Sequence, residues 1–447
     1  MTSGIGRRRF LGSMAALAAL PGCAARVGTV SGPSGPVATE PSGPVPTGPA
    51  PSKPAGTPAN PAAPPVVAGA AADPAMAAKY PPLPPLGEAT FARRYDRLRG
   101  LAREAGAGVV FVTSGTTSFA YLAGSRVERS ERLIALILPV DGAPFLVAPA
   151  FEVERMRRQT RIQDVRPWEE QDSPFAVAAT ALGAARGHAK ILIEPHTEYQ
   201  TALALGRALA GATLIDGAAA FERLRLHKDD DELARIRRAI AVTQDVFEAA
   251  FAELRPGVRD REVSQAIAER FRRAGYDGYA LVQFGPLSAL PHGHPRGDAL
   301  AEGNVVLIDG GCEVDGYWSD ITRTRVFGGP LPPELAKVHA IVFDAQSAAI
   351  ERVRPGVACQ DIDRAARAVI ERAGYAAQFT HRLGHGLGMD GHEPAYLVEG
   401  NAQRLEPGFV FTAEPGIYLP GKFGVRIEDD VLCGPDGAIV LSRRDTR

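Results

Sequence analysis

The sequence has few cysteines, no excess of positive charge and few long apolar runs; abundant cysteine, positive charge and long apolar runs are, respectively, the features of disulfide-rich, nucleic-acid-binding and membrane-spanning proteins. Its 447 residues include only four cysteines and no CxxC pair, which argues against a disulfide-stapled domain. Lys and Arg number 50 against 51 Asp and Glu, so the net charge of −1 offers no electrostatic footprint for nucleic acid or an anionic membrane. After the N-terminal segment, no apolar run predicts a transmembrane helix. We therefore expect a small, uncharged or zwitterionic substrate and no nucleic-acid partner.

Residues 1–23 predict an export signal. They join the basic Arg7-Arg8-Arg9 to an apolar run that ends in small residues before Cys23, and the run is too short for a good membrane span. Arg7-Arg8 followed by Phe10-Leu11 resembles the twin-arginine export motif, and Leu20-Pro21-Gly22-Cys23 resembles a lipoprotein cleavage box. We expect a periplasmic or cell-envelope protein with a lipid anchor at Cys23. A general secretory signal is the alternative.

Residues 24–87 predict a tether. From about Gly28 to Gly87 the chain is a mixture of Pro, Ala, Gly, Ser and Thr with almost no large apolar side chain. Such a stretch cannot bury enough surface to offset the entropy lost on ordering. We therefore expect a disordered, partly polyproline-II linker.

Residues 88–225 predict a first folded domain of the α/β type. The segment ARRYDRLRGLAREAGAG has helical apolar spacing, and GVVFVTS is typical of a buried strand. The segment ERLIALILPVDGAPFLVAP predicts a hairpin that turns at Asp141-Gly142, and further alternation of helices and strands follows. This region holds no cluster of metal-ligand residues, so we expect the chemistry in the rest of the chain.

Residues 226–447 predict a second domain built of two similar halves. The acidic stretch from Asp229 to Glu232 begins a long amphipathic helix, at the end where the helix dipole favours negative charge. Two further helices each follow an Arg-Pro-Gly-Val turn, one beginning at Arg255 and the other at Arg354. This repetition predicts an internal duplication. Chance is the alternative, since a Pro-Gly turn before a helix is common.

A predicted hairpin in this domain carries two carboxylates on apolar strands. The segment NVVLIDGGCEVDGYWSDITRTRVF turns within residues 313–316, and Asp309 and Asp320 are symmetric about that turn. They should therefore face each other across the strands, with Cβ atoms about 4.5–5.5 Å apart. Two facing carboxylates repel each other unless a cation lies between them. A solvated pair beside a turn is the alternative.

A second predicted hairpin repeats this construction near the C-terminus. The segment FVFTAEPGIYLPGKFGVRIEDDVL turns about residues 420–422, and Glu414 and Glu428 are again symmetric about the centre. Between the hairpins, HRLGHGLGMDGHEP places His381, His385 and His392 among glycines. Four carboxylates and one imidazole form an oxygen-rich set that suits Mn²⁺, Co²⁺, Fe²⁺ or Zn²⁺. Two such ions, about 3.5–4 Å apart, would balance the charge and share an activated water.

The segments LIDGG, WSDITRT, GHGLG, TAEPGIY and VRIED together resemble the pita-bread metallopeptidases. This family includes methionine aminopeptidases, Xaa-Pro aminopeptidases, prolidases and creatinase. The resemblance covers about residues 228–447, and residues 88–225 resemble the creatinase/prolidase N-terminal domain. It implies an α+β fold: a catalytic domain of duplicated halves, with an antiparallel sheet and flanking helices, after an α/β N-terminal domain. It also implies a homodimer.

The resemblance also implies a role for each site residue. Two divalent ions, Mn²⁺ first among them, would be held by Asp309, Asp320, His385, Glu414 and Glu428. Glu414 would also carry a proton from the attacking water to the leaving amine. His292 and His392 match histidines that steady the scissile carbonyl, and His381 matches a further histidine on the substrate side. Arg426 matches an arginine that either contacts the substrate or neutralises the carboxylates.

The same resemblance favours proline-directed cleavage of small peptides. Creatinase lacks the intact set of metal ligands, and methionine aminopeptidases usually lack the extra domain. A Xaa-Pro aminopeptidase and a Xaa-Pro dipeptidase both remain, because HEPAYLVEGN has no arginine where some prolidases bind a dipeptide's carboxylate, and Arg404 comes later. Two alternatives are another aminopeptidase specificity and a pita-bread module that binds peptides without cleaving them.

Overall fold

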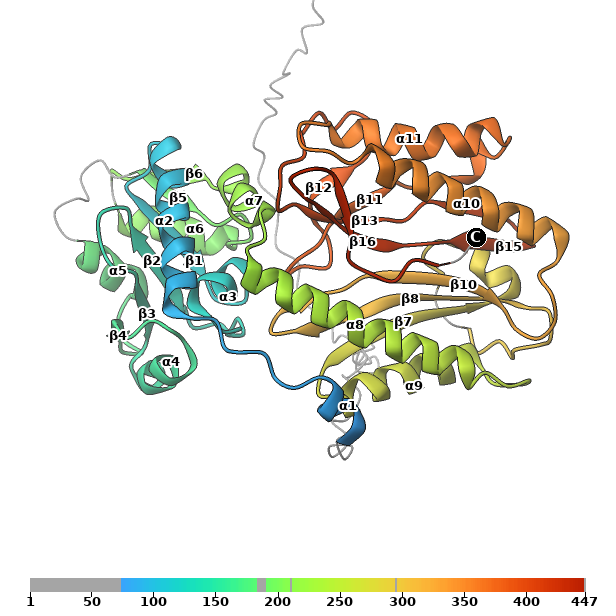
Figure 1. Cartoon of the computed structure of the whole chain (residues 1–447). Helices are drawn as coiled ribbons and strands as arrows, with labels where there is room; N and C mark the ends of the chain where they lie inside the picture. The colour runs from blue at the N-terminus through green and yellow to red at the C-terminus, as the bar shows by residue number, and fades with distance from the viewer. Residues whose placement is uncertain (1–73, 183–189, 210, 294–295, 446–447) are drawn as a thin grey trace, which may run out of the picture. The chain divides into compact units, whose positions relative to one another are not determined.

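In the computed structural model, the described chain comprises residues 74–182, 190–209, 211–293 and 296–445 (Figure 1). The predicted signal peptide, Cys23 and the tether as far as residue 73 lie outside these ranges. Within the ranges, no helix combines the length and the apolar composition that crossing a bilayer requires.

The first α/β region is built on a six-stranded mixed sheet with the order β4-β3-β2-β1-β5-β6. The predicted hairpin at Asp141-Gly142 is confirmed, because β2 and β3 pair antiparallel with Ile137 opposite Phe145. Strands β5 and β6 run parallel to β1 and to each other. The strands are β1 (Val109–Thr113), β2 (Ala135–Pro139), β3 (Phe145–Pro149), β4 (Val165–Trp168), β5 (Lys190–Ile193) and β6 (Thr213–Asp216). The helices are α1 (Pro74–Lys79), which precedes the region, α2 (Glu88–Glu104), α3 (Thr117–Ala123), α4 (Val153–Gln159), α5 (Pro174–Leu182), α6 (Tyr199–Ala208) and α7 (Ala218–Leu226).

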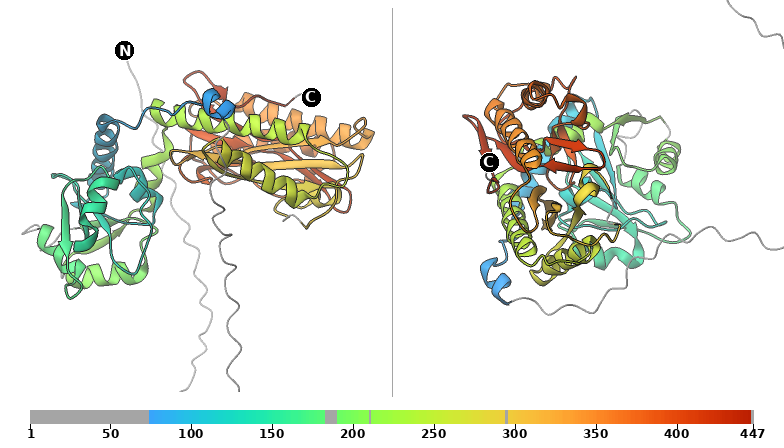
Figure 2. Two further views of the ribbon diagram at one scale, coloured as in Figure 1. Left: turned by 90° about the horizontal axis from the view of Figure 1, so that it is seen from below. Right: turned by 90° about the vertical axis from the view of Figure 1, so that its right-hand side faces the viewer.

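Helix α8 (Asp230–Ala252) opens the second region, as the acidic stretch predicted. The Asp229 side chain accepts a hydrogen bond from the Glu232 backbone N–H (3.0 Å), and the Glu232 side chain accepts one from the Asp229 N–H (2.9 Å). This capping box satisfies two N–H groups that would otherwise lack partners at the helix start. The helix then runs along the strands of the first half of this region (Figures 1 and 2).

The second region consists of two halves that repeat one construction. In each half a helix pair precedes a set of strands, and the turn between the two helices is built in the same way. Gly257 N–H donates to Leu300 O and Gly356 N–H donates to Leu405 O, both at 2.8 Å. Both glycines adopt positive φ, 82° and 86°. The repeated Arg-Pro-Gly-Val segments therefore mark a structural duplication.

The first half comprises α8, α9 (Asp260–Arg273), β7 (Asp277–Phe284), β8 (Val305–Val314), β9 (Tyr317–Trp318) and β10 (Ile321–Val326). The second comprises α10 (Pro333–Arg352), α11 (Cys359–Arg372), β11 (Gly384–Gly386), β12 (Glu393–Leu397), β13 (Val410–Ala413), β14 (Gly416–Leu419), β15 (Phe423–Arg426), β16 (Asp429–Cys433) and β17 (Ala438–Val440). Nearly all strand pairs in both halves are antiparallel neighbours within one half. The two halves are joined by a backbone bridge between Thr322 and Glu428, and by a hydrogen bond from Trp318 N–H to Gly388 O at 2.9 Å.

Residues 74–87 depart from the prediction of a disordered tether, which covered residues 24–87. Residues 74–79 form α1. Residues 80–87 form a strap on α8, where Tyr80 is buried and donates a hydrogen bond from its hydroxyl to Ala241 O (3.0 Å). Arg235 of the same helix donates to Pro84 O (2.6 Å). Composition missed this segment because one aromatic side chain and a few proline carbonyls are enough to dock a stretch that is otherwise poor in large apolar residues.

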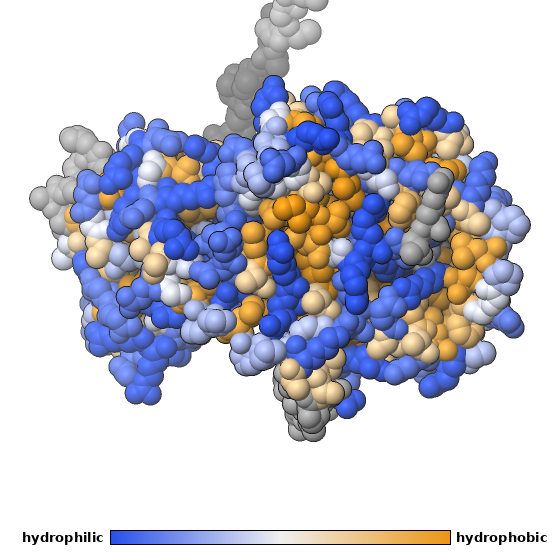
Figure 3. All heavy atoms as spheres, in the orientation of Figure 1, coloured by the Kyte–Doolittle hydropathy of each residue, from blue (hydrophilic) through white to orange (hydrophobic). Residues whose placement is uncertain are grey.

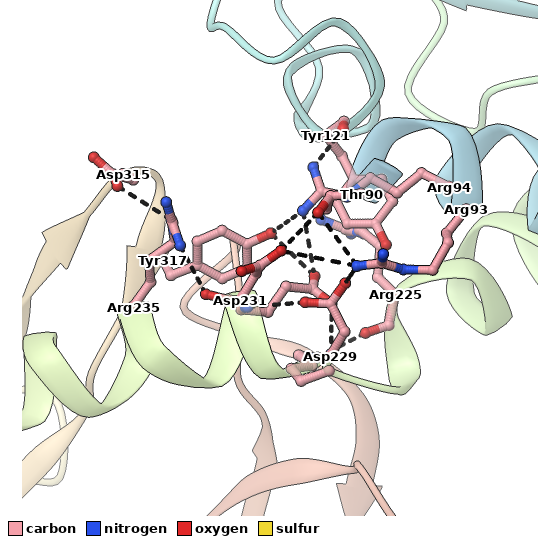
Figure 4. Close-up of polar contacts among 12 residues, drawn as sticks. Thr90, Arg93, Arg94, Tyr121, Arg225, Asp229, Asp231, Arg235, Asp315 and Tyr317 are labelled. Atoms are coloured by element: carbon pink, nitrogen blue, oxygen red, sulfur yellow. Dashed lines mark hydrogen bonds and ion pairs between the residues drawn. The ribbon is translucent and has the colours of Figure 1, made fainter. Parts of the chain in front are cut away.

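One hydrophobic core joins the first region to the first half of the second, including Leu98, Ile236 and Val306, and another fills the second half. A network of polar contacts, partly buried, includes Arg94, Tyr121 and Tyr317 (Figure 4). In it, Arg94 donates to Tyr121 O and to the Tyr317 hydroxyl, both at 2.7 Å. Tyr317 belongs to the hairpin that carries Asp309 and Asp320, so the first region contacts a site-bearing element directly.

The surface mixes hydrophilic and apolar side chains, and on the face in Figure 3 the apolar ones gather mainly in the middle and right of the view. Among the described residues, the exposed large hydrophobic side chains are Phe151, Tyr199, Tyr279, Leu290, Leu331 and Ile439. They lie on separate elements of the fold. Such scattered residues are normal on a monomer surface and do not by themselves indicate an interface.

We expect Asp229→Ala to lower the free energy of unfolding by about 1–2 kcal/mol, because it removes the α8 cap. It also breaks the ion pair of Asp229 with Arg93. Asp230→Ala is the matched control, since this neighbour is exposed and should change stability by no more than about 0.5 kcal/mol. Thermal unfolding of the two variants would show a larger loss for Asp229→Ala; equal losses would contradict the capping role.

Candidate metal centre

The first carboxylate hairpin is present, but its turn is centred one residue later in the sequence than predicted, so the strand pairing is shifted. Val314 pairs with Tyr317, and Asp309 pairs with Thr322 rather than with Asp320. The tip lies at Asp315, whose φ is 49°, and such a conformation cannot be read from symmetry of the sequence. Asp309 and Asp320 therefore lie diagonally on one face instead of directly opposite each other.

The register of the second hairpin is as predicted. Strands β13 and β16 pair with Ala413 opposite Asp429, and β14 and β15 pair with Gly416 opposite Arg426. Both pairings follow one register, which places Glu414 opposite Glu428 in the short gap between them. Their side chains are 15% and 2% exposed, respectively. Rigid strands thus hold each carboxylate at the edge of the apolar core.

His385 lies between the two glycines of β11 and is buried. Its Nδ1 lies 3.1 Å from Gly386 O, and a carbonyl can only accept, so Nδ1 carries the proton in the neutral ring. The free lone pair of Nε2 then points toward Glu414 Oε1 (3.3 Å) and Asp320 Oδ2 (3.8 Å). This is the orientation in which a histidine acts as a metal ligand.

The five residues predicted as ligands converge on one cavity of about 390 Å³. Asp309, Asp320 and Glu428 bring one ligand atom each within 4.8 Å of one another, and His385, Glu414 and Glu428 do the same. Asp320, His385 and His392 form a third such group, so Asp320, His385 and Glu428 each belong to two groups. The arrangement can accommodate two neighbouring cations.

The charges in this cavity are only partly compensated by the protein. Burial raises the pKa of Asp320 well above its usual range, and the carboxylates of Asp309 and Glu414 raise it further. Burial likewise raises the pKa of Glu428. Burial also acts to raise the pKa of Glu414, but the contact with His385 in its protonated form prevails and lowers the pKa of Glu414 to about 2. Divalent cations would remove the repulsion among these groups, and the oxygen-rich donor set fits hard ions.

Thr322 links the two hairpins and was not singled out from the sequence. Its hydroxyl lies 2.6 Å from both Asp309 Oδ1 and Glu428 Oε2. Arg426 reaches the same point, since its Nε donates to the Thr322 hydroxyl (3.0 Å) and its Nη2 pairs with Asp309 Oδ2 (2.8 Å). Thr322 would have been found from the correct register, because it is the strand partner of Asp309.

Arg426, Tyr418 and His381 form a hydrogen-bonded chain along the cavity. His381 Nδ1 lies 2.7 Å from Arg382 O and must donate to it, which leaves Nε2 as an acceptor. The Tyr418 hydroxyl lies 2.8 Å from that Nε2 and accepts from Arg426 Nη1 at 2.9 Å. Tyr418 can therefore donate to His381 while accepting from Arg426. Burial lowers the pKa of His381, so its ring favours the neutral form.

His292, His392 and Arg382 complete the lining of the cavity. The ring of His392 lies 3.9 Å from that of His385, and Arg382 Nη2 lies 3.3 Å from His392 Nδ1. His392 is exposed as a whole, but its partial burial at the rim of the cavity, helped by His385 and Arg382, lowers its pKa to about 4. Arg382 also stacks over the ring of Tyr396, and no motif had marked it. Arg404 lies elsewhere and donates to Gly356 O.

Comparison with known proteins places both regions of the chain. A family model described as metallopeptidase family M24 matches residues 234–435, and one described as the creatinase/prolidase N-terminal domain matches residues 94–227. Probable dipeptidase PepE of Mycobacterium tuberculosis (strain ATCC 25618 / H37Rv) is 36% identical over 358 residues, which cover 79% of this chain and 94% of the relative.

Solved structures of similar proteins match this chain across both regions. Dipeptidase PepE from Mycobacterium ulcerans is 34% identical with a TM-score of 0.75, over 81% of this chain and 98% of that one. Prolidase from Thermococcus sibiricus is 33% identical with a TM-score of 0.74, over 81% and 99%. X-Pro aminopeptidase from Thermotoga maritima is 26% identical with a TM-score of 0.70, over 78% and 99%. The predicted fold, an α/β domain before a duplicated α+β domain, is confirmed.

We expect Glu428→Gln to have opposite effects on stability without and with metal. In chelator, the variant should melt a few degrees above the wild type, since about 1 kcal/mol corresponds to about 2–4 °C, because a buried and repelled carboxylate is removed. With Mn²⁺ in excess, the wild type should gain stability by binding and the variant should gain much less.

Thermal melts and metal content by mass spectrometry measure these effects. Glu371→Gln, an exposed residue of α11, is the control and should behave as the wild type in both conditions. Equal Mn²⁺ shifts in wild type and Glu428→Gln would show that Glu428 does not hold the metal.

Proposed function

Because this chain belongs to metallopeptidase family M24, we propose that it hydrolyses Xaa-Pro peptide bonds with two bound divalent ions. One observation carries the proposal: carboxylate pairs from two separate hairpins meet an imidazole in a single cavity. When bound, the ions would lower the pKa of a shared water enough for hydroxide to form near neutral pH. Mn²⁺ is the first candidate, and Co²⁺, Zn²⁺ and Fe²⁺ are alternatives.

The residues of the cavity divide into those that hold the ions and those that handle the substrate. The ions would be held by Asp309, Asp320, His385, Glu414 and Glu428. Glu414 is partly accessible from the cavity, so it can take a proton from the attacking water and pass it to the leaving amine. His292 and His392, at the exposed side of the cavity, are placed to donate to the carbonyl oxygen as negative charge develops on it.

Proline specificity is supported by chemistry and by the names of similar proteins. A prolyl peptide bond has no N–H, so a peptidase that depends on hydrogen bonding to that group gains nothing from it. The intact set of five ligand-type residues argues against creatinase chemistry. The solved structures that resemble this chain include proteins titled prolidase, X-Pro aminopeptidase and Xaa-Pro dipeptidase.

Arg382 favours a dipeptide over a longer peptide. Its guanidinium lines the cavity, and no ion pair with a carboxylate is found for it among the described residues. Arg426, the other arginine of the cavity, is already paired with Asp309. A dipeptide places its free carboxylate two residues from its N-terminal amine, within a cavity of this size, so Arg382 can supply a charge-assisted hydrogen bond to it.

The place of action follows from the N-terminal sequence. We propose that the enzyme is exported through its twin-arginine signal and held at the cell envelope by a lipid on Cys23. Twin-arginine export moves folded proteins, which suits an enzyme that loads its metal before leaving the cytoplasm. The family resemblance supports a homodimer.

Glu414→Gln should abolish hydrolysis of Gly-Pro while the protein still folds. Loss of the proton carrier alone predicts a fall in kcat of at least about 10²-fold. Glu371→Gln is the matched control and should keep full activity. Chelator should inactivate the wild type, and Mn²⁺, Co²⁺ or Zn²⁺ should restore it. An active Glu414→Gln variant would remove the assigned role, and a metal-loaded wild type that binds but never cleaves Xaa-Pro peptides would favour the binding module.

Arg382→Met should remove any preference for a free carboxylate. We expect the wild type to cleave Gly-Pro better than Gly-Pro amide, and the variant to lose about 10–100-fold on Gly-Pro with little change on the amide, because a hydrogen bond to a charged group contributes about 1.5–3 kcal/mol. Arg364→Met, on the exposed face of α11, is the control. Equal wild-type rates on acid and amide, with faster cleavage of longer Xaa-Pro peptides, would point to an aminopeptidase.

A further inference from the structure

The segment that carries His392 is held by residues outside the cavity. We define residues 387–392 as the histidine loop; it joins β11, which holds His385, to β12, which begins at Glu393. His392 itself is exposed. Its placement against the cavity therefore depends on how the loop backbone is fixed.

Four charged residues form a cluster at the loop: Arg225, Lys228 and Glu393 lie under it and are largely buried, whereas Asp390 belongs to the loop and is 35% exposed. Lys228 Nζ pairs with Glu393 Oε2 at 2.8 Å, and both side chains are 2% exposed. Arg225 Nη1 lies 2.8 Å from Asp390 Oδ2 and 3.2 Å from Glu393 Oε1. Two cations thus face two anions, so the cluster is neutral as a whole. Burial acts to raise the pKa of Glu393, but Lys228 and Arg225 lower it below its usual range, so the carboxylate is ionised.

The loop is folded directly on the Glu393 carboxylate. The Asp390 backbone N–H donates to Glu393 Oε1 at 3.1 Å. A Cβ atom added to Gly388 would lie 2.7 Å from Glu393 Oε2, so the backbone at this position lies against the carboxylate and leaves no room for a side chain. Glu393, the residue next to His392, therefore fixes the loop backbone through its contacts at Gly388 and Asp390.

The N-terminal domain reaches the same loop. Thr117, at the start of α3, donates a hydrogen bond from its hydroxyl to Asp390 Oδ1. Arg126 Nη2 donates to Met389 O at 3.4 Å. Asp390 is therefore shared between Arg225, at the end of the N-terminal domain, and Thr117, inside it.

We propose that Arg225, Lys228, Asp390 and Glu393 form a positioning cluster for His392, and that Thr117 couples the N-terminal domain to it. None of the five is among the residues that line the cavity, so they act through His392 and not on the substrate. The kinetic consequence rests on the proposed peptidase function, whereas the structural claim does not. Loss of the cluster should misplace His392 while the metal ligands, held by strands, stay in place.

Asp390→Asn tests the proposal with little change in shape. We expect kcat on Gly-Pro to fall by about 10–100-fold, with KM within about 2-fold and metal content unchanged, because a small misplacement of a catalytic group costs about that much. In a His392→Ala background, Asp390→Asn should cause no further loss, since the group it positions is already absent. A purely structural role would lower activity in both backgrounds.

Two further variants give the comparison. Thr117→Val removes one contact from the N-terminal domain, the hydrogen bond to Asp390, and should give a smaller loss in kcat of the same kind. Asp315→Asn is the control: Asp315 also forms an ion pair, with Arg235 at 3.1 Å, but it is exposed and lies outside the histidine loop. It should leave activity unchanged.

A readout without catalysis keeps the proposal separate from the proposed function. With ¹³C-labelled histidine, the ring signal of His392 should shift in Asp390→Asn, while that of His381 should not. An unchanged His392 signal with unchanged kcat would overturn the proposal, and so would a loss of metal in proportion to activity. If the wild type cleaves no Xaa-Pro peptide, the proposed function fails, and the His392 signal still decides whether the cluster positions the ring.

Discussion

Repulsion among four carboxylates in one cavity is the constraint on which the catalytic region depends. Asp309, Asp320, Glu414 and Glu428 would separate if they were on mobile loops, so they are carried on or directly beside paired strands. Arg426 offsets part of the charge through Asp309, and the Thr322 hydroxyl lies between two of the carboxylates. The carboxylate charge that Arg426 does not offset leaves the rigid site with excess negative charge. Such a site favours the binding of a cation.

The duplication explains how such a site can be assembled. Each half supplies one carboxylate pair, so neither half alone has to hold four like charges on adjacent strands. The halves meet where Glu428 N–H donates to Thr322 O at 3.2 Å, close to the cavity itself. The N-terminal domain adds contacts to one element from each half, through Tyr317 and through Asp390. The site is therefore held from three sides, and its precision is a property of the whole chain.

Much of this was predictable because it depends on local patterns. The start of α8 at its acidic stretch and the Asp141-Gly142 hairpin follow from residue chemistry, and Glu414 and Glu428 were paired correctly because the turn centred on Gly421 is symmetric in sequence. The predicted register of the first hairpin was wrong because its tip includes Asp315 at positive φ, which symmetry of the sequence cannot reveal. Thr322, Tyr418 and Arg382 are single polar residues whose importance arises only from partners distant in the sequence. The strap, residues 80–87, was predicted to be disordered because its composition is poor in large apolar residues.

The strap on α8 also determines how the folded part would carry a mechanical load. If the preceding chain is anchored at a membrane, a pull on it first reaches the contacts of Lys79, Tyr80 and Pro84 with α8, and Tyr80 is part of the core on which that helix packs. Tension would therefore be borne in shear against α8 before it could reach the strands that hold the carboxylates.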